Sequence, residues 1–364
     1  MRKASVELAR LIACLLVIGV HVSLSTVVND TYDASRLLSA CLVADGVAIF
    51  WLISGFFMFN TKSYWKLLKR TFKNIVIPMI IFLIFCFFLS GYLVDRTSLA
   101  VSITHTGEDY LNLLKGFFSW NVVVSCSGHL WYLMVYFVVI LMFPILKAYV
   151  DSIKQDVKKQ KLFLIISAML LIFNDISANT MAEFSYHSFS GAIPAAIFFV
   201  WGSIIYQHRE AIKTKISFVK CVILFVGLNI VRLLIILNRQ GHDYSYTNIL
   251  YWYSFLGLIC ALCIIFACMF LINDNKESKI NRVICWLSSY TFGIYIVHML
   301  VVIMLDRYSI SKYILEYVTG KIGGAIGEYF YTIVMILLVF AISLCIIIVV
   351  KIIKELALKI VNKR

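Results

Sequence analysis

The stretch Arg10-Leu-Ile-Ala-Cys-Leu-Leu-Val-Ile-Gly-Val-His21 places a cation and an imidazole in a run that is otherwise apolar enough for a lipid bilayer. Ionisable groups are costly at that depth and need a reason. In a helix, the eleven residue steps between Arg10 and His21 put them on nearly one face, about 16 Å apart along the axis. Two interpretations stay open: a functional pair, or a snorkelling interfacial arginine with a histidine that only satisfies a helix contact.

The whole chain shares the apolar character of this stretch. Hydrophobic residues make up 62% of the 364 residues, charged residues only 14%, and the mean hydropathy is +0.92, whereas soluble domains are about 45–50% apolar. The composition therefore predicts an all-α, polytopic membrane protein in contact with membrane lipids.

The formal net charge of +14 does not indicate nucleic acid, because the basic residues fall between the apolar runs. Cys260 and Cys263 have no second Cys-x-x-Cys pair, so we expect no metal site.

Apolar runs of the length needed to cross a bilayer, about 20 residues, recur along the chain. We expect about ten transmembrane helices, and the segments that meet the criterion lie near residues 5–27, 38–59, 74–93, 130–150, 162–178, 190–207, 217–238, 249–272, 284–304 and 328–350.

Lysine and arginine concentrate in every second loop between these runs. The basic clusters are Lys62 to Lys73, Lys154 to Lys161, Arg209 to Lys215 and Lys276 to Arg282. With ten crossings all four lie on one side, which the positive-inside rule makes cytoplasmic, with both termini inside. We therefore expect one transmembrane domain over residues 1–350, a basic cytoplasmic tail over 351–364, and a short interfacial helix at 108–118 on the opposite side.

The second apolar run contains Asp45 and the sequence Phe50-Trp-Leu-Ile-Ser-Gly-Phe56. Asp45 could orient His21 from just under the outer interface, or it could be solvated at the start of a helix. Ser54 and Gly55 are small residues, which are typical of closely packed helices in membranes.

A basic turn, Lys69-Arg-Thr-Phe-Lys73, leads directly into the third run. Arg70 and Lys73 lie about one helical turn apart and could bind the phosphates of a cytoplasmic nucleotide-like cofactor, because a guanidinium group makes bidentate contacts to phosphate. They could equally be an anchor that follows the positive-inside rule.

Further candidates lie in the later runs. Trp131 and Tyr132 could belong to an aromatic belt, or could line a sugar-binding site together with His129. Arg232 and His298 lie inside apolar runs. Each is a functional candidate by default in lipid; the alternative is that it only holds a pair of helices together.

Together these residues resemble the acyltransferase-3 family of bacterial integral membrane proteins, which includes O-acetyltransferases of surface polysaccharides and peptidoglycan. The motifs that carry the resemblance follow the family's order: Arg10 with His21, Phe50 to Phe56, Arg70 with Lys73 before Pro78, His129-Leu-Trp-Tyr-Leu133 and Gly293-Ile-Tyr-Ile-Val-His298. Members often have two arginines where this chain has an arginine and a lysine. Members that modify peptidoglycan commonly carry an additional extracytoplasmic esterase-like domain.

The resemblance implies transfer of an acetyl or similar acyl group from cytoplasmic acetyl-CoA to a hydroxyl of a cell-surface or lipid-linked glycan, by a multi-pass protein of the bacterial plasma membrane. His21 would act as general base or as transient acyl acceptor, with Asp45 supporting the imidazolium. Arg10 would hold the thioester oxygen or the CoA phosphates from the inner side, and Arg70 and Lys73 would bind the nucleotide end of the donor. Those expected to bind the acceptor are His129, Trp131, Tyr132, Arg232 and His298.

Two other classes of function remain open. A related membrane segment occurs in the serine racemases of vancomycin resistance, which suggests a transporter of serine or another small polar solute, with His21, Arg232 and Asp45 along an aqueous path. The chain has three prolines and no matching pair of broken helices, which disfavours that reading. The third class is a glycan flippase or assembly partner without chemistry of its own. The acyltransferase implied by the resemblance could also hand its acyl group to an extracytoplasmic transferase.

Overall fold

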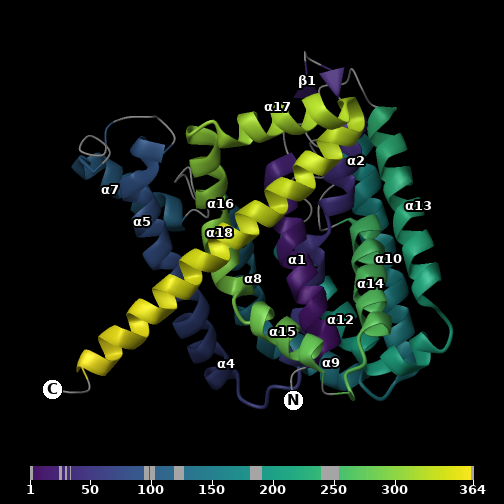
Figure 1. Ribbon diagram of the computed structural model, residues 1–364. Coiled ribbons are helices and arrows are strands. Elements are labelled where there is room, and N and C mark those ends of the chain that lie inside the picture. Colours follow the sequence, from purple (N-terminus) through teal and green to yellow (C-terminus); the bar gives the residue numbers. More distant parts are fainter. Residues whose placement is uncertain are drawn as a thin grey trace.

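The computed structural model describes residues 3–23, 27–28, 31–32, 34–93, 98, 103–118, 127–180, 191–238, 254–276 and 278–361. Its architecture is a bundle of helices built around α1 (Ala4–Ser23), which packs against α2, α3, α14, α15, α16 and α18 (Figure 1). The other helices are α2 (Ala34–Val43), α3 (Gly46–Met58), α4 (Tyr64–Thr71), α5 (Ile77–Leu93), α7 (Gly107–Phe118), α8 (Trp131–Leu141), α9 (Phe143–Ile153), α10 (Val157–Thr180), α12 (Ala192–Lys213), α13 (Phe218–Leu237), α14 (Phe255–Leu271), α15 (Lys279–Ser288), α16 (Thr291–Arg307), α17 (Ile310–Ile322) and α18 (Gly324–Val361). Two-residue strands, β1 (Val27–Val28) and β2 (Thr31–Tyr32), pair as a small antiparallel hairpin.

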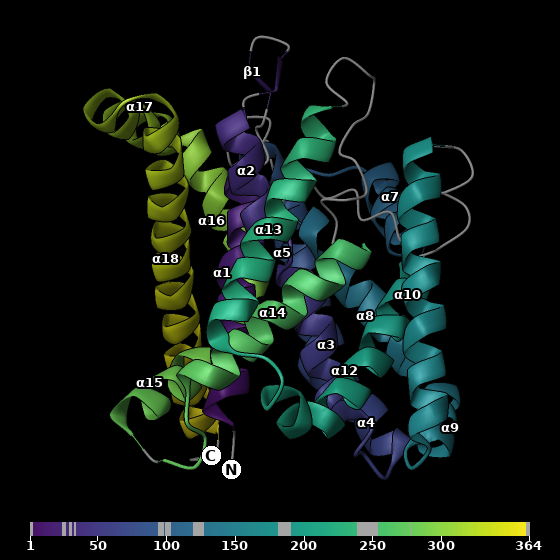
Figure 2. The same cartoon turned by 90° about the vertical axis from the view of Figure 1, so that its right-hand side faces the viewer.

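The prediction of an all-α membrane protein is confirmed at the level of fold class. Within the described residues, five helical segments are long and apolar enough to cross a bilayer, or up to seven if two bent pairs each count as one span. Each predicted apolar run contains a described helix, but the count of about ten crossings stays a prediction. The start of α1 and the end of α18 lie at the same end of the bundle (Figures 1 and 2). The side of the membrane that this end faces also stays a prediction.

Several of the predicted runs are broken inside the bundle, and the sequence explains most of the breaks. The run at 38–59 is divided into α2 and α3 by a turn at Ala44 and Asp45. The helix at 130–153 bends by 63° at Met142, just before Pro144, which cannot donate a backbone N–H. A π-helical turn at Phe72–Val76 precedes Pro78, whose ring excludes the ordinary hydrogen bond to the preceding turn.

Glycines allow α3 and α12 to approach closely. A Cβ atom at Gly55 would overlap the carbonyl oxygen of Phe199, and a Cβ atom at Gly202 would overlap the carbonyl oxygen of Leu52. The two substitutions would therefore push the same two backbones apart from opposite sides. The close packing that the sequence predicted at the small residue Gly55 is therefore present.

The helix predicted at 108–118 is present as α7. The backbone N–H and hydroxyl of Thr106 both donate to the Asp109 carboxylate at 2.8 Å, and the Asp109 N–H donates back to the Thr106 hydroxyl, which is a reciprocal cap of the helix start. The backbone hydrogen bond from Thr106 holds the pKa of Asp109 below its ordinary value. The helix therefore begins where the local sequence indicates, although its position at a membrane interface stays a prediction.

Candidate functional site

Three histidines from distant parts of the chain meet inside the bundle. His21 lies in the last turn of α1, His129 in the 3₁₀ turn Gly128–Leu130 that leads into α8, and His298 in the middle of α16. The distances between ring centroids are 5.2 Å from His21 to His298, 4.7 Å from His129 to His298 and 6.2 Å from His21 to His129. We call these three residues the histidine cluster.

Backbone carbonyl groups fix the tautomers of two members of this cluster. His298 donates from Nδ1 to the carbonyl oxygen of Tyr295 at 2.6 Å, and His129 donates from Nε2 to the carbonyl oxygen of Ile296 at 3.0 Å. A carbonyl group only accepts, so each of these nitrogens carries the proton. Tyr295 in turn donates its hydroxyl to the carbonyl oxygen of His129. The α16 segment therefore holds both rings in place.

The opposite nitrogens of the same two rings carry lone pairs without a donor. His129 Nδ1 and His298 Nε2 are buried and have no hydrogen-bond partner within the described residues. A buried acceptor left unsatisfied costs about 1–3 kcal/mol. A hydrogen-bond donor placed beside the histidine cluster would satisfy these two buried nitrogens.

Aromatic side chains pack between the histidine cluster and the end of the bundle at which α1 begins and α18 ends. We call this end the terminal end and these side chains the aromatic wall. The Tyr295 ring lies 5.5 Å from His129 and 5.4 Å from Tyr132, and Tyr132 lies 4.6 Å from Trp51. The hydroxyl groups of Tyr132 and Ser54 share a hydrogen bond. The predicted Tyr132 therefore does reach the cluster, through Tyr295. Trp131, also predicted, is 36% exposed and faces outward beside Tyr132.

Cationic residues lie on the terminal side of this wall. Arg10 pairs with the buried Glu7 at 2.6 Å, and Glu7 also accepts a hydrogen bond from Ser288. The charges of Arg10 and Arg70 both reach the hydroxyl of Tyr136 on α8. Two of the three predicted donor-binding cations therefore lie near enough to one tyrosine to interact with it electrostatically.

The third predicted cation stands apart from that tyrosine. Lys73 is exposed on the π-helical turn that follows α4. The structure places it about one turn from Arg70, on the surface.

Asp45 and Arg232 form a separate buried cluster. Both side chains are fully buried, and the guanidinium group binds the carboxylate through two contacts, Nη2 to Oδ1 at 2.6 Å and Nη1 to Oδ2 at 3.0 Å. Nη1 also contacts the Asn229 side chain at 3.2 Å and the Cys41 carbonyl at 3.3 Å. Both carboxylate oxygens of Asp45 thus bind Arg232, and the predicted roles of Asp45 beside His21 and of Arg232 at the acceptor stay predictions.

Sequence reasoning missed three residues of the site. Glu7 precedes Arg10 by three positions, the helical spacing of an ion pair. Tyr295 precedes His298 by three positions within the same motif, and this spacing places its carbonyl near the imidazole. Tyr136 has no such signal, because its approach to Arg10 and Arg70 depends on how α1, α4 and α8 pack.

No group of three or more His, Cys, Asp or Glu side chains in the described parts of the chain has a geometry suited to a metal ion. The three imidazole rings lie 4.7–6.2 Å apart between centroids. Their chemistry is that of proton acceptors and donors.

Comparison with known proteins identifies the family. A family model described as an acyltransferase domain matches residues 3–351, which contain every residue of the site. No curated protein and no solved structure matches the chain. A match over nearly the whole length shows that the chain belongs to the acyltransferase-3 family.

Proposed function

We propose that this membrane acyltransferase moves an acetyl or similar short acyl group from acyl-CoA to a hydroxyl of a cell-surface or lipid-linked glycan, in the plasma membrane of a bacterium. The observation that carries the proposal is the histidine cluster, in which two buried basic nitrogens await a donor such as a hydroxyl group. The family match supports acyl transfer. The acyl chain, the donor and the glycan are our proposals.

His21 is the proposed reacting group. As general base it takes the proton of the acceptor hydroxyl while the oxygen attacks the thioester carbonyl, the carbon–sulfur bond breaks, and the CoA thiolate receives the proton. Alternatively, the imidazole attacks first and carries the acyl group until the hydroxyl displaces it. Both routes end with an ester and free CoA.

His129 and His298 are the proposed acceptor-binding residues. Their unpartnered nitrogens can accept the hydrogen bond of the incoming hydroxyl, because the bonds to backbone carbonyl groups place the proton on the opposite nitrogen of each ring. Tyr132 and Tyr295 would line the route to this space. A hydroxyl held by two acceptors is oriented for attack before the reaction begins.

Arg10, Arg70 and Lys73 are the proposed donor-binding residues. Arg10 lies eleven residue steps before His21 on the same face of α1, about 16 Å away along the axis. This span suits a pantetheine arm that carries the thioester to His21 while its phosphates stay near the arginines. Charge-assisted contacts to phosphate are strong enough to hold such a donor.

The transporter alternative has no support from the family match. Two of the residues that it places on an aqueous path, Asp45 and Arg232, are buried and bind each other. An extracytoplasmic transferase that receives the acyl group remains a possible partner within the acyltransferase proposal.

Release of CoA from acetyl-CoA tests the proposal. The purified protein in lipid nanodiscs should release CoA when membrane glycans are added, and His21→Ala should abolish the release without changing the melting temperature. Lys158→Ala, on a distant surface turn, is the matched control. Equal release by wild type and His21→Ala would overturn the mechanism.

A further inference from the structure

The sequence Lys279-Ile-Asn-Arg-Val-Ile-Cys-Trp-Leu-Ser288 forms α15, a short helix at the terminal end of the bundle (Figures 1 and 2). Ser278 caps its start, because the Ser278 hydroxyl accepts a hydrogen bond from the Asn281 N–H at 3.1 Å. The helix ends in a turn at Ser289 and Tyr290, and α16 leaves this turn at an angle of 58° to α15. α15 therefore lies obliquely at the end of the bundle and does not continue the axis of α16.

The sides of α15 differ in burial. One side holds Ile284 and Ser288, which are buried. Another side carries Ile280, Val283 and Trp286, which recur at three-residue intervals and are 50–66% exposed. We call these three residues the apolar stripe. Large apolar side chains gathered on a surface in this way indicate contact with a membrane or with another protein.

Basic residues border the apolar stripe. Lys276 lies in the turn before α15, Lys279 and Arg282 lie on the helix, and all three are exposed. Residues 276–282 contain one acidic residue, Glu277, which lies outside the described residues, so the stretch has a net charge of +2. Within the described parts of the chain, no carboxylate forms an ion pair with any of the three cations. The stretch therefore offers positive charge to an anion outside the protein.

A further cation lies beside Trp286. Lys351 Nζ, on α18, is 5.3 Å from the Tyr290 ring centroid, and the Tyr290 ring is 5.3 Å from the Trp286 ring. The Lys351 side chain is exposed. The apolar stripe therefore has a cation near each of its ends.

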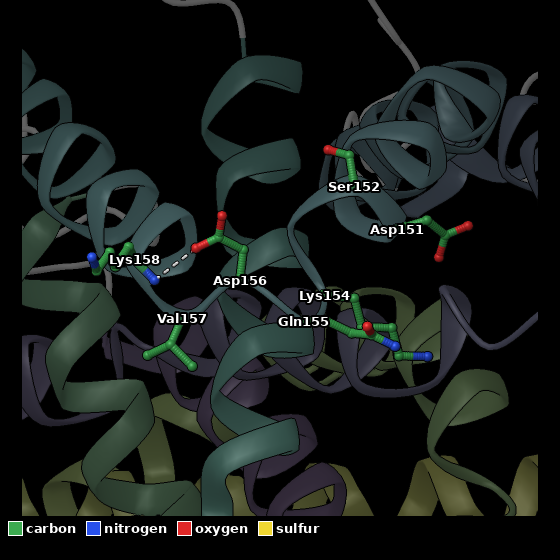
Figure 3. A pocket seen from close by; sticks show the side chains of 7 residues that line it. All are labelled: Asp151, Ser152, Lys154, Gln155, Asp156, Val157 and Lys158. Atoms are coloured by element: carbon green, nitrogen blue, oxygen red, sulfur yellow. Dashed lines mark hydrogen bonds between the residues drawn. The ribbon is translucent and has the colours of Figure 1, made fainter.

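A second basic segment at the same end of the bundle provides the contrast. Figure 3 shows the depression of about 710 Å³ at the turn between α9 and α10. Its lining has two lysines, Lys154 and Lys158, two carboxylates, Asp151 and Asp156, and no aromatic side chain. Each carboxylate pairs with a neighbouring lysine, at 2.8 Å and 3.5 Å. This turn balances its charges within the protein and has no apolar stripe beside them.

The buried side of α15 reaches the first helix of the bundle. Ser288 donates its hydroxyl to Oε2 of the buried Glu7 on α1. The same oxygen accepts from Arg10 Nη1 at 2.6 Å. The position of α15 therefore affects the carboxylate that holds the Arg10 side chain.

We propose that α15 lies in the lipid–water interface, binds the phosphate groups of anionic lipids through Lys279 and Arg282, and thereby keeps Ser288 on Glu7. Interfacial helices bury an apolar side at the boundary of the acyl chains while their cations reach anionic headgroups, and tryptophan is enriched at that depth. A second copy of the chain fits the surface less well, because a symmetric contact would bring the same cations face to face. The effect on Arg10 as a donor-binding residue rests on the proposed function.

Quenching of Trp286 fluorescence by brominated lipid tests the lipid contact. The full chain is reconstituted in phosphatidylcholine vesicles with a minor fraction of brominated phosphatidylglycerol or, separately, of brominated phosphatidylcholine. The Trp286 signal is the difference between each protein and the same protein with Trp286→Phe. We expect brominated phosphatidylglycerol to quench this signal about twofold more strongly.

Variants show which cations cause the preference. Lys279→Gln/Arg282→Gln should abolish it. Lys154→Gln/Lys158→Gln, which removes two charges from the depression of Figure 3, should keep it. Equal quenching by the two lipids would overturn the proposal, and so would a preference that survives in the α15 double variant. Absence of quenching by either lipid would assign the apolar stripe to a protein contact and would also overturn it.

Kinetics in nanodiscs test the connection to Arg10. Phosphatidylglycerol should lower the KM of the wild type for acetyl-CoA about tenfold with kcat unchanged. Ser288→Ala should keep the quenching preference and lose this lipid dependence of KM, because the hydrogen bond to Glu7 is gone. Lipid dependence that persists in Ser288→Ala would overturn the connection.

The two measurements separate this proposal from the proposed function. If Trp286 shows the lipid preference but acetyl-CoA is never consumed, the lipid contact stands and the proposed function fails. If acetyl transfer occurs while Trp286 shows no preference, the proposed function stands and the lipid contact fails.

Discussion

Two buried polar clusters in this bundle differ in how their hydrogen bonds are used. The Asp45–Arg232 cluster directs its groups to one another, and only Nε of the guanidinium lacks a partner within the described residues. In the histidine cluster, one ring nitrogen of His129 and one of His298 each bind a backbone carbonyl group of α16. The other ring nitrogen of each residue has no hydrogen-bond partner within the described residues. A polar group that is satisfied internally holds helices together, whereas one held open suits a substrate. We expect stability to depend on the first cluster and activity on the second.

After His21, the largest expected effect on activity comes from His298. His298→Ala should lower kcat for acetyl transfer about 100-fold, the size of loss expected when the attacking hydroxyl is no longer oriented. The melting temperature should also fall, because the variant loses the hydrogen bond from Nδ1 to the Tyr295 carbonyl and the packing of a buried ring. Steady-state kinetics and a thermal unfolding curve on the same preparation measure both. A large fall in melting temperature with unchanged kcat would assign His298 to packing instead.

The largest expected effect on stability comes from Asp45. Asp45→Ala leaves the buried Arg232 charge without its partner, and breaking a buried pair in this way costs about 3–5 kcal/mol. The variant should melt at a clearly lower temperature or accumulate poorly. Asp45→Leu combined with Arg232→Met should recover stability and retain CoA release. Loss of catalysis in a stable double variant would show that this pair does more than hold α3 and α13 together.

A smaller loss of stability should follow from widening the contact between α3 and α12. Gly55→Val places a side chain against the carbonyl of Phe199, and overpacking of this kind costs about 1–3 kcal/mol. Gly227→Val, where a Cβ meets nothing within 4 Å, is the matched control. Thermal unfolding of the two variants should separate them, and equal melting temperatures would mean that the contact is looser than described.

The smallest expected effect is on the binding of the acyl donor. Arg70→Ala removes one of the two cations that reach Tyr136 and should raise KM for acetyl-CoA about tenfold, with kcat nearly unchanged. Lys158→Ala should leave both constants unchanged. An unchanged KM in the Arg70 variant would restrict Arg70 to a role as a membrane anchor.

The residues themselves indicated the fold class and the importance of one site residue. The apolar composition and the run from Arg10 to His21 predicted a helical membrane protein with an unusual histidine on its first helix. Gly55 was expected to pack a helix closely, and it does. These features are local, because they depend on composition or on spacing within one segment.

The arrangement of the site depends on contacts that no single segment encodes. His129 and His298 are separated by 169 positions and meet His21 only because α16 packs against α1 and the 3₁₀ turn before α8 lies near both. Asp45 was placed beside His21 since both lie in neighbouring apolar runs, but Arg232 lies closer in the fold and takes both carboxylate oxygens. The breaks near Met142 and Asp45 likewise divide runs whose hydropathy is continuous.

The central claim is that the histidine cluster, and not the Asp45–Arg232 cluster, performs the chemistry. Its most direct test is release of CoA from acetyl-CoA in nanodiscs supplied with membrane glycans, compared between His21→Ala and the Asp45→Leu/Arg232→Met double variant. The account predicts that the His21 variant keeps its melting temperature and loses release, whereas the double variant retains release. Retained release in a folded His21→Ala protein would contradict it.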